Sequence, residues 1–162
     1  MSSWNIIKGL KFRQVTVLTG LFLRHPLFMF STTRATFLAM RIAEEEFPDI
    51  HGKHNKANAF RHALWNMLIT KKCSRFSKDL ESVLSWTKRI TDWHEEFSPN
   101  EELAKMMDLH NNRVGRKMYK EVFYEYTEEI VKLMKEKLLE AIQIASVLEF
   151  EKHQNKLVYL ED

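Results

Sequence analysis

The sequence predicts an all-α fold, a single helical bundle of five or six helices with a long C-terminal helix. Its 162 residues include only 4 Gly and 3 Pro, whereas folds built from many strands and turns use both residue types heavily. Hydrophobic residues make up 44% and charged residues 29%, which suits a globular chain with its own core. No linker, repeat or low-complexity tract divides the sequence, so we expect one domain over residues 1–162.

The N-terminal part, residues 1–43, is basic and apolar, and it contains no acidic residue although the whole chain has a net charge of only +3. Its most apolar stretch, residues 15–30, is interrupted by an Arg-His-Pro triplet and is too short to span a bilayer. This part could be a helix packed on the domain, a segment lying on a membrane surface, or an export signal. We therefore expect a cytoplasmic or peripheral membrane protein, with export left open.

The first of the middle helices is predicted to begin at Ser31 or Thr32, either of which suits an N-cap, and to end before Pro48. A polar loop follows, and the next helix covers residues 57–72. Apolar residues occur on every side of this second helix, so we expect a central helix buried all round.

Two further helices are expected over residues 77–96 and from about residue 100 to at least residue 116. The junction between them has a capping signature, with Ser98 as N-cap, Pro99 at the first helical position and Glu101 at N3. The signature predicts a break between the two helices at this point.

The C-terminal third keeps a helical period, and no Gly or Pro follows Gly115. This part is either one very long helix or two helices, with a kink at Gly115. Residues 124–149 have heptad-like spacing, which is explained by packing on the core or by a homodimer formed through this helix.

Polar side chains occupy one face of the expected central helix. Asn58, His62 and Asn66 recur at i, i+4 and i+8, and one helical turn separates each from the next. The same construction places His94 and His110 on the inward faces of two other helices. Buried amides and imidazoles need hydrogen-bond partners, so this pattern predicts either a polar network or a lined cavity.

These histidines predict a metal centre or an acid–base site. The expected ligands of a divalent ion, zinc or manganese, are His62, His94, Asp108 and His110, because imidazole and carboxylate groups are usual ligands for both metals. The alternative is a structural role, in which each histidine is an ordinary core residue bonded to its own neighbours. Cys73 is the only cysteine, so thiolates supply no ligand cluster and no internal disulfide can form, which fits a reducing compartment.

Three motif blocks carry a resemblance to a known family: "NAFRHALWNMLIT", "TDWHEE" and "MDLHNNRVGR". They resemble ordered blocks of an uncharacterised bacterial domain that is also found as a C-terminal module of polymorphic (RHS-type) toxins. The resemblance covers the motif-bearing core, residues 50–120, and implies no established activity. The site residues that it implies are Asn58, Arg61, His62, His94, Glu95, Asp108, Asn111 and Asn112.

We expect the chain to be a metal-dependent hydrolase that acts on a phosphodiester, a phospholipid included. Glu95 would orient or deprotonate the attacking water, and Arg61 would hold an anionic group. Asn58 and Asn112 would position the imidazoles. The alternative is a non-enzymatic helical binding or membrane-associated module whose polar residues form a structural network. A nucleic-acid partner is disfavoured because no helix combines a basic face with aromatic residues.

Overall fold

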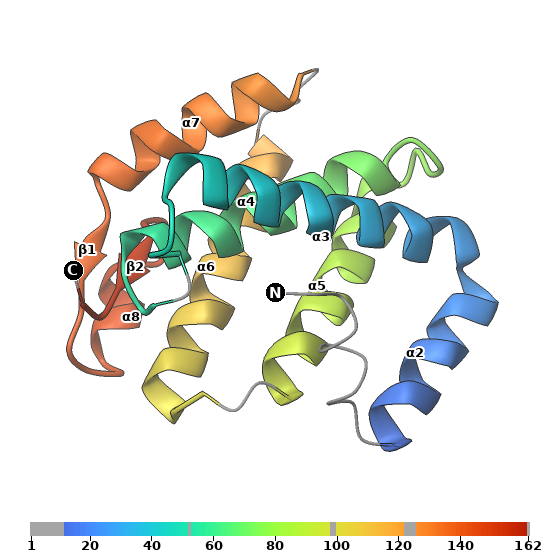
Figure 1. The fold of residues 1–162 in the computed structure, drawn as a ribbon, viewed down its shortest axis with the longest axis horizontal. Helices are drawn as coiled ribbons and strands as arrows, with labels where there is room; N and C mark the ends of the chain where they lie inside the picture. The colour runs from blue at the N-terminus through green and yellow to red at the C-terminus, as the bar shows by residue number, and fades with distance from the viewer. Residues whose placement is uncertain (1–11, 52, 98–99, 122–125, 162) are drawn as a thin grey trace.

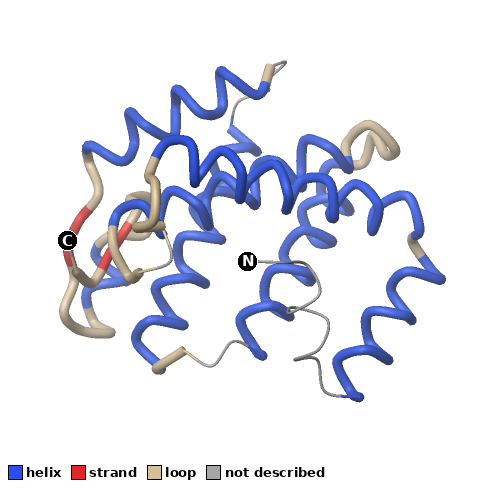
Figure 2. Tube along the Cα trace, viewed as in Figure 1, coloured by secondary structure: helices blue, strands red, loops and turns tan. Residues whose placement is uncertain are grey.

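The computed structural model describes residues 12–51, 53–97, 100–121 and 126–161 of the chain, and they form a mainly helical fold (Figure 1). The all-α prediction is confirmed at this level. The helices are α2 (Phe12–Arg24), α3 (Pro26–Glu46), α4 (Lys56–Cys73), α5 (Leu80–Phe97), α6 (Glu102–Glu121), α7 (Thr127–Leu139) and α8 (Glu149–Lys152). Two short strands, β1 (Ile142–Gln143) and β2 (Val158–Tyr159), pair in parallel near the C-terminus (Figure 2).

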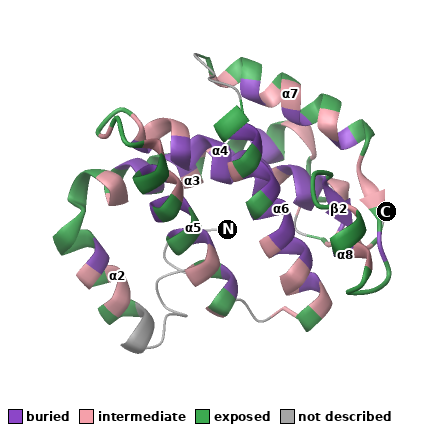
Figure 3. Ribbon diagram, turned by 180° about the vertical axis from the view of Figure 1, so that it is seen from behind, coloured by how far each residue is buried: buried purple, intermediate pink, exposed green. Residues whose placement is uncertain are grey.

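Helix α4 is the centre of the fold, as its sequence predicts. Fourteen of its 18 residues are buried, and it packs against α3, α5, α6 and α7. In Figure 1, α3 lies across α4 while α5 and α6 run side by side below it. Figure 3 shows the buried residues gathered along α4 and the facing sides of its neighbours. Asn55 caps the helix by accepting a hydrogen bond from the Asn58 backbone amide at 3.2 Å.

Helices α4 and α6 approach closely where Gly115 faces Ala63. A Cβ atom at position 115 would lie 2.8 Å from the Cα of Ala63 and would overlap its carbonyl oxygen. Gly115 has no positive φ, so the glycine is required for space and not for backbone conformation. It does not kink the chain, because α6 continues from Glu102 to Glu121.

Helix α3 begins earlier than its sequence suggests. It starts at Pro26, which occupies the first turn after the N-cap residue His25, and Pro favours this position because its fixed φ suits a helix start. Ser31 and Thr32 are therefore buried inside the helix rather than capping it. Thr32 instead accepts a hydrogen bond from the Trp86 indole at 3.0 Å.

The start of α5 follows a capping residue of the chain. Helix α5 begins at Leu80 rather than near Ser77, since the Asp79 carboxylate accepts from the backbone amides of Glu81 at 3.1 Å and Ser82 at 3.3 Å. The capping signature at residues 98–101 falls largely outside the described residues, and α6 begins at Glu102.

The long C-terminal helix is wrong beyond Leu139, where α7 ends. Ile142 pairs with Val158 and Gln143 with Tyr159 in the two-stranded sheet. The hydrogen bonds that replace the expected helix join residues about 16 positions apart, so a local periodicity cannot predict them.

The N-terminal helix α2 packs on the domain, with Leu21 2% exposed. None of the helices within the described ranges is long and apolar enough to cross a membrane.

Candidate functional site

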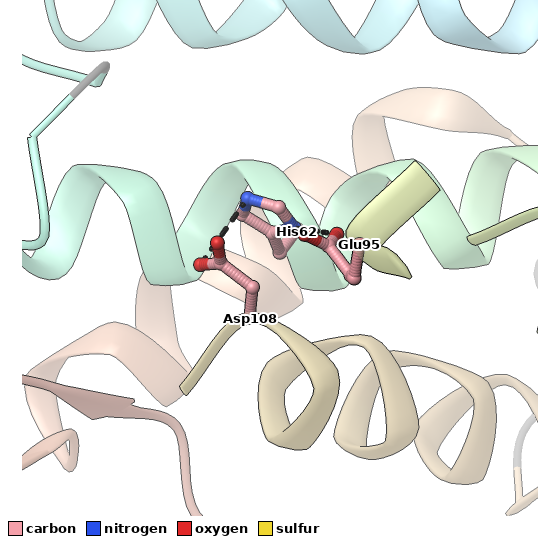
Figure 4. A group of neighbouring side chains, drawn as sticks. All are labelled: His62, Glu95 and Asp108. Atoms are coloured by element: carbon pink, nitrogen blue, oxygen red, sulfur yellow. Dashed lines mark ion pairs between the residues drawn. The ribbon is translucent and has the colours of Figure 1, made fainter. Parts of the chain in front are cut away.

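A buried cluster joins three helices at the middle of the fold. It contains His62 from α4, Glu95 from α5 and Asp108 from α6 (Figure 4). Their side chains are only 1–2% exposed, and one potential ligand atom from each lies within 4.8 Å of the other two. We call these three residues the central cluster.

The His62 imidazole lies between the two carboxylates. Its Nδ1 is 3.3 Å from Oε1 of Glu95, and its Nε2 is 3.4 Å from Oδ1 of Asp108. Nε2 also lies 2.8 Å from Nη2 of Arg61. Because a guanidinium can only donate, Nε2 accepts from Arg61 and the ring proton resides on Nδ1. The contacts therefore define a neutral imidazole whose N–H lies between Asn112 Oδ1 and Glu95 Oε1, each 3.3 Å from Nδ1.

Each carboxylate of the cluster has one oxygen with an amide donor and one oxygen without a donor in the described part of the chain. Glu95 Oε1 accepts from Asn112 at 3.0 Å and Asp108 Oδ2 accepts from Asn100 at 2.9 Å. The remaining oxygens, Glu95 Oε2 and Asp108 Oδ1, are buried and have no hydrogen-bond donor among the described residues. A buried acceptor without a donor costs roughly 1–3 kcal/mol, so two in one cluster indicate a place for a cation or for bound protons.

The same surroundings shift the two pKa values in opposite directions. Burial alone would raise the pKa of Glu95, but the hydrogen bond from His62, the electrostatic effects of His62 and His94, and the hydrogen bond from Asn112 together outweigh it, so the pKa falls below its ordinary value. Burial raises the pKa of Asp108, and the negative charge of Glu95 adds to that rise against the opposing effects of His62 and Arg61. Glu95 is thus the more firmly ionised carboxylate of the cluster.

Amide side chains support the cluster from outside. Asn66 donates to Oδ1 of Asn112 at 2.6 Å and to the carbonyl oxygen of His62 at 2.9 Å. Its own oxygen accepts from Arg116 at 2.8 Å and from the Thr91 hydroxyl at 3.3 Å. These bonds fix Asn112, whose amide then holds Glu95.

Two further predicted residues frame the α4 side of the cluster. Asn58 donates to the carbonyl oxygen of Lys53 at 2.5 Å, while its side-chain oxygen is buried without a donor among the described residues. Arg61 donates through Nε to the carbonyl oxygen of His51 at 3.1 Å. Burial lowers the pKa of the Arg61 guanidinium, but nearby Asp108 and Glu95 oppose that effect.

The expected meeting of three histidines is not observed. His94 is exposed and stands edge-on to the Trp65 ring, with centroids 5.3 Å apart. Its neighbour Glu95 turns inward instead, because consecutive residues on a helix point about 100° apart. His94 is therefore outside the central cluster.

His110 and Asn111 serve the C-terminal segment rather than the cluster. His110 donates through Nε2 to the carbonyl oxygen of Lys156 at 2.9 Å. Asn111 makes two bonds to the backbone of Val158, at 2.9 and 3.0 Å. Both side chains hold the β2 segment against α6, so their inward direction has a structural reason.

Sequence reasoning missed two members of the site, Thr91 and Asn100. Thr91 lies one helical turn before Glu95 and faces Asn66, so its position on the inward face was available from the helical period. Asn100 lies just before α6 and reaches eight residues ahead to Asp108. No local signal in the sequence predicts that contact.

The fold and the cluster together define a small, mainly helical domain with a buried histidine–carboxylate centre among the described residues. The chain belongs to the family described as a domain of unknown function, DUF6973, whose model matches residues 19–142. The match contains the whole central cluster and ends at β1. No curated protein matches the chain.

Proposed function

We propose that the chain is a metal-dependent hydrolase with a single divalent ion bound at the central cluster. The observation that carries the proposal is the pair of buried carboxylate oxygens without donors, Glu95 Oε2 and Asp108 Oδ1, beside an imidazole nitrogen. A bare acceptor in a protein interior is stabilised by a cation as well as by a hydrogen bond. Zinc or manganese suits a ligand set of one imidazole and two carboxylates.

In this proposal the two carboxylates have different tasks, and the geometry of His62 supports that division. One ion uses one ring nitrogen, and Nε2 is the nitrogen that is free of the ring proton. Asp108 Oδ1 lies 3.4 Å from Nε2. This distance matches the ligand–ligand separation of about 3.4 Å that follows from zinc bonds of about 2.1 Å in a tetrahedron. Behind the ring, the Nδ1 proton is shared between Glu95 Oε1 and Asn112 Oδ1, the usual arrangement behind a metal-binding imidazole. A carboxylate oxygen of Glu95 lies within 4.8 Å of the other two potential ligand atoms, and in this proposal Glu95 moves toward the ion to supply the third ligand.

Arg61 couples the ion to the substrate in this proposal. Its guanidinium occupies the lone pair of Nε2 at 2.8 Å, so an ion at Nε2 displaces it. The released guanidinium is a bidentate donor suited to a phosphodiester, phospholipid included, which is the substrate class that we propose. A divalent ion supplies Lewis-acid polarisation and an acidified water. A role as a toxin module remains a prediction from the motif blocks.

The test is metal content and its dependence on the cluster. Purified protein is stripped of metal with a chelator and titrated with Zn²⁺ or Mn²⁺, and the melting temperature is measured at each metal concentration. Binding at 100 times the dissociation constant stabilises the fold by about 2.7 kcal/mol, a rise of roughly 5–10 °C for a domain of this size. His62→Ala should abolish the rise, and the matched control His94→Ala, at an exposed histidine of the next helix, should retain it.

Arg61→Gln gives a second and sharper test. If Arg61 and the ion compete for Nε2, the variant should bind the metal more tightly than the wild-type chain. Hydrolysis of bis(p-nitrophenyl) phosphate by the metal-loaded protein, lost in Asp108→Asn but kept in the control Asp92→Asn, tests the reaction. A protein that takes up no metal, or metal uptake that His62→Ala leaves unchanged, would end the proposal.

One observation favours a second candidate, a non-enzymatic module whose polar residues form a structural network. The three cluster side chains are almost completely buried, and hydrogen bonds link them to Asn112, Asn66 and Arg116. For such a network, the chelator leaves the melting temperature unchanged while Asn112→Ala lowers it by several degrees. A chelator-induced drop that His62→Ala removes decides against the network and for the metal centre.

A further inference from the structure

The outer surface of the N-terminal helices is unusually apolar. Among the described residues, thirteen large hydrophobic side chains are exposed, and seven of them lie within residues 15–40. The phenylalanines in this set, Phe22, Phe30 and Phe37, are 53–58% exposed, and Leu23 is 74% exposed. Large apolar groups gathered on one part of a surface mark an interaction site more often than single exposed ones do.

On α3 the exposed residues form a single stripe. Leu27, Phe30, Arg34, Phe37 and Arg41 follow each other at intervals of three and four residues, and all five are exposed. The opposite side of the same helix carries the buried residues that pack on α4. We call these five residues the α3 outer stripe. Because its other side is anchored in the core, α3 can present the stripe without leaving the domain.

The charge of this region is of one sign. From residue 12 to residue 43 the chain contains arginines and no aspartate or glutamate, and Glu44 is the first carboxylate. The guanidinium of Arg34 lies 5.5 Å from the centroid of the Phe30 ring, so basic and aromatic groups are interleaved within the stripe. The three glutamates at the end of α3, Glu44, Glu45 and Glu46, limit the basic region on that side.

We propose that the α3 outer stripe, with Phe22 and Leu23 beside it, binds the surface of an anionic lipid bilayer. Aromatic and aliphatic side chains on a basic helix face fit the boundary between headgroups and acyl chains. Each arginine near an anionic surface adds attraction to the lipid charge. An acidic protein surface would satisfy the arginines but would leave the phenylalanines and leucines exposed to water.

The proposal is tested by vesicle flotation with the full chain. Vesicles of phosphatidylcholine alone are compared with vesicles that also contain phosphatidylserine, at low and high salt. We expect binding only to the anionic vesicles and weaker binding at high salt. The double variants Phe30→Ser/Phe37→Ser and Arg34→Glu/Arg41→Glu should each lower the partition coefficient by about tenfold or more.

The matched controls lie in the C-terminal segment at α8. Leu148 is 74% exposed and Lys152 is exposed, so Leu148→Ser and Lys152→Glu make the same kinds of change elsewhere and should leave vesicle binding unchanged. Circular dichroism confirms that every variant is folded. Absence of binding, or binding that neither double variant reduces, overturns the proposal.

A second copy of the chain is the competing occupant of the stripe. Sedimentation of the wild-type chain without vesicles measures it directly. A dimer that Phe30→Ser/Phe37→Ser disperses, in a protein that does not bind vesicles, assigns the stripe to self-association and overturns the lipid proposal. Neither measurement depends on the central cluster, so the result stands whether or not a metal binds there.

Discussion

Replacement of Gly115 by alanine tests the close approach that brings α6 to the central cluster. In an isolated helix the change would be favourable by about 1 kcal/mol, because glycine is a poor helix former. Here the new Cβ would overlap the carbonyl oxygen of Ala63 and lie 2.8 Å from its Cα. These are backbone atoms of a helix packed on all sides, so they cannot move aside as a flexible side chain can.

The magnitude follows from these opposing effects. Overpacking of a core costs typically 1–3 kcal/mol, and rigid backbone on the other side places this substitution at or above the upper end of that range. After the gain in helix propensity, Gly115→Ala should lower the free energy of unfolding by about 1–2 kcal/mol or more. For a domain of this size that is a fall of roughly 2–8 °C in melting temperature.

The matched control is Gly20→Ala in α2, where an added Cβ has nothing within 4 Å. This change should raise the free energy of unfolding by about 0.5–1 kcal/mol, because only the propensity difference acts. Urea unfolding of the three proteins gives the midpoints and slopes that separate the two outcomes. A Gly115→Ala protein as stable as the wild-type chain, beside a stabilised Gly20→Ala, would refute the reasoning about the α4–α6 contact.

Three further outcomes are expected. Burial raises the pKa of the Cys73 thiol to about 12, so Ellman's reagent should label it only after unfolding, and fast labelling of the native chain would contradict its burial. Asn111→Ala removes two bonds to Val158 and should cost about 2 kcal/mol of stability, with faster amide exchange in β2; unchanged exchange there would argue against the contact. Burial lowers the pKa of His110 below its ordinary value of 6.5, so the unfolded chain binds a proton that the native chain does not as the pH falls through 6.5. The free energy of unfolding should therefore decrease as the pH drops below 6.5. Urea titrations at several pH values should show a smaller decrease for His110→Asn, and an unchanged pH dependence in that variant would contradict the role of His110.

The central helix was predictable because its signal is local. Apolar residues on every side of residues 57–72 indicate burial, and the polar triplet Asn58, His62 and Asn66 stands out against them. The structure bears this out with α4 at Lys56–Cys73. Likewise, Asp108 and Asn112 were recognisable as a polar stripe on α6, and both are buried beside His62.

The errors arise where distant contacts decide. The end of α7 depends on the pairing of β1 with β2, which heptad spacing does not report. The start of α3 is a different case, because Pro26 is a local signal for a first helical turn and the choice of Ser31 or Thr32 as N-cap overlooked it. The central cluster differs from the predicted ligand set for the same reason as the end of α7, since Glu95 and not His94 lies beside His62. His94 and Glu95 are neighbours, and a helical period resolves direction no better than about one residue.

Partners across the core decide which of these two neighbours turns inward. The Asn112 amide donates to Glu95 Oε1 at 3.0 Å, and the His62 ring proton faces the same oxygen at 3.3 Å. Two N–H groups therefore point at this position. The imidazole of His94 could accept only one of these hydrogen bonds, and it would place a second ring beside His62. A carboxylate accepts both and stays ionised, which places a negative charge on one side of His62 opposite Asp108 on the other. Two carboxylates around a neutral imidazole require positive charge nearby, and Arg61 supplies it at Nε2 in this structure. Whether a divalent ion displaces that guanidinium from Nε2 is therefore the measurement that decides between the proposed metal centre and a purely structural network.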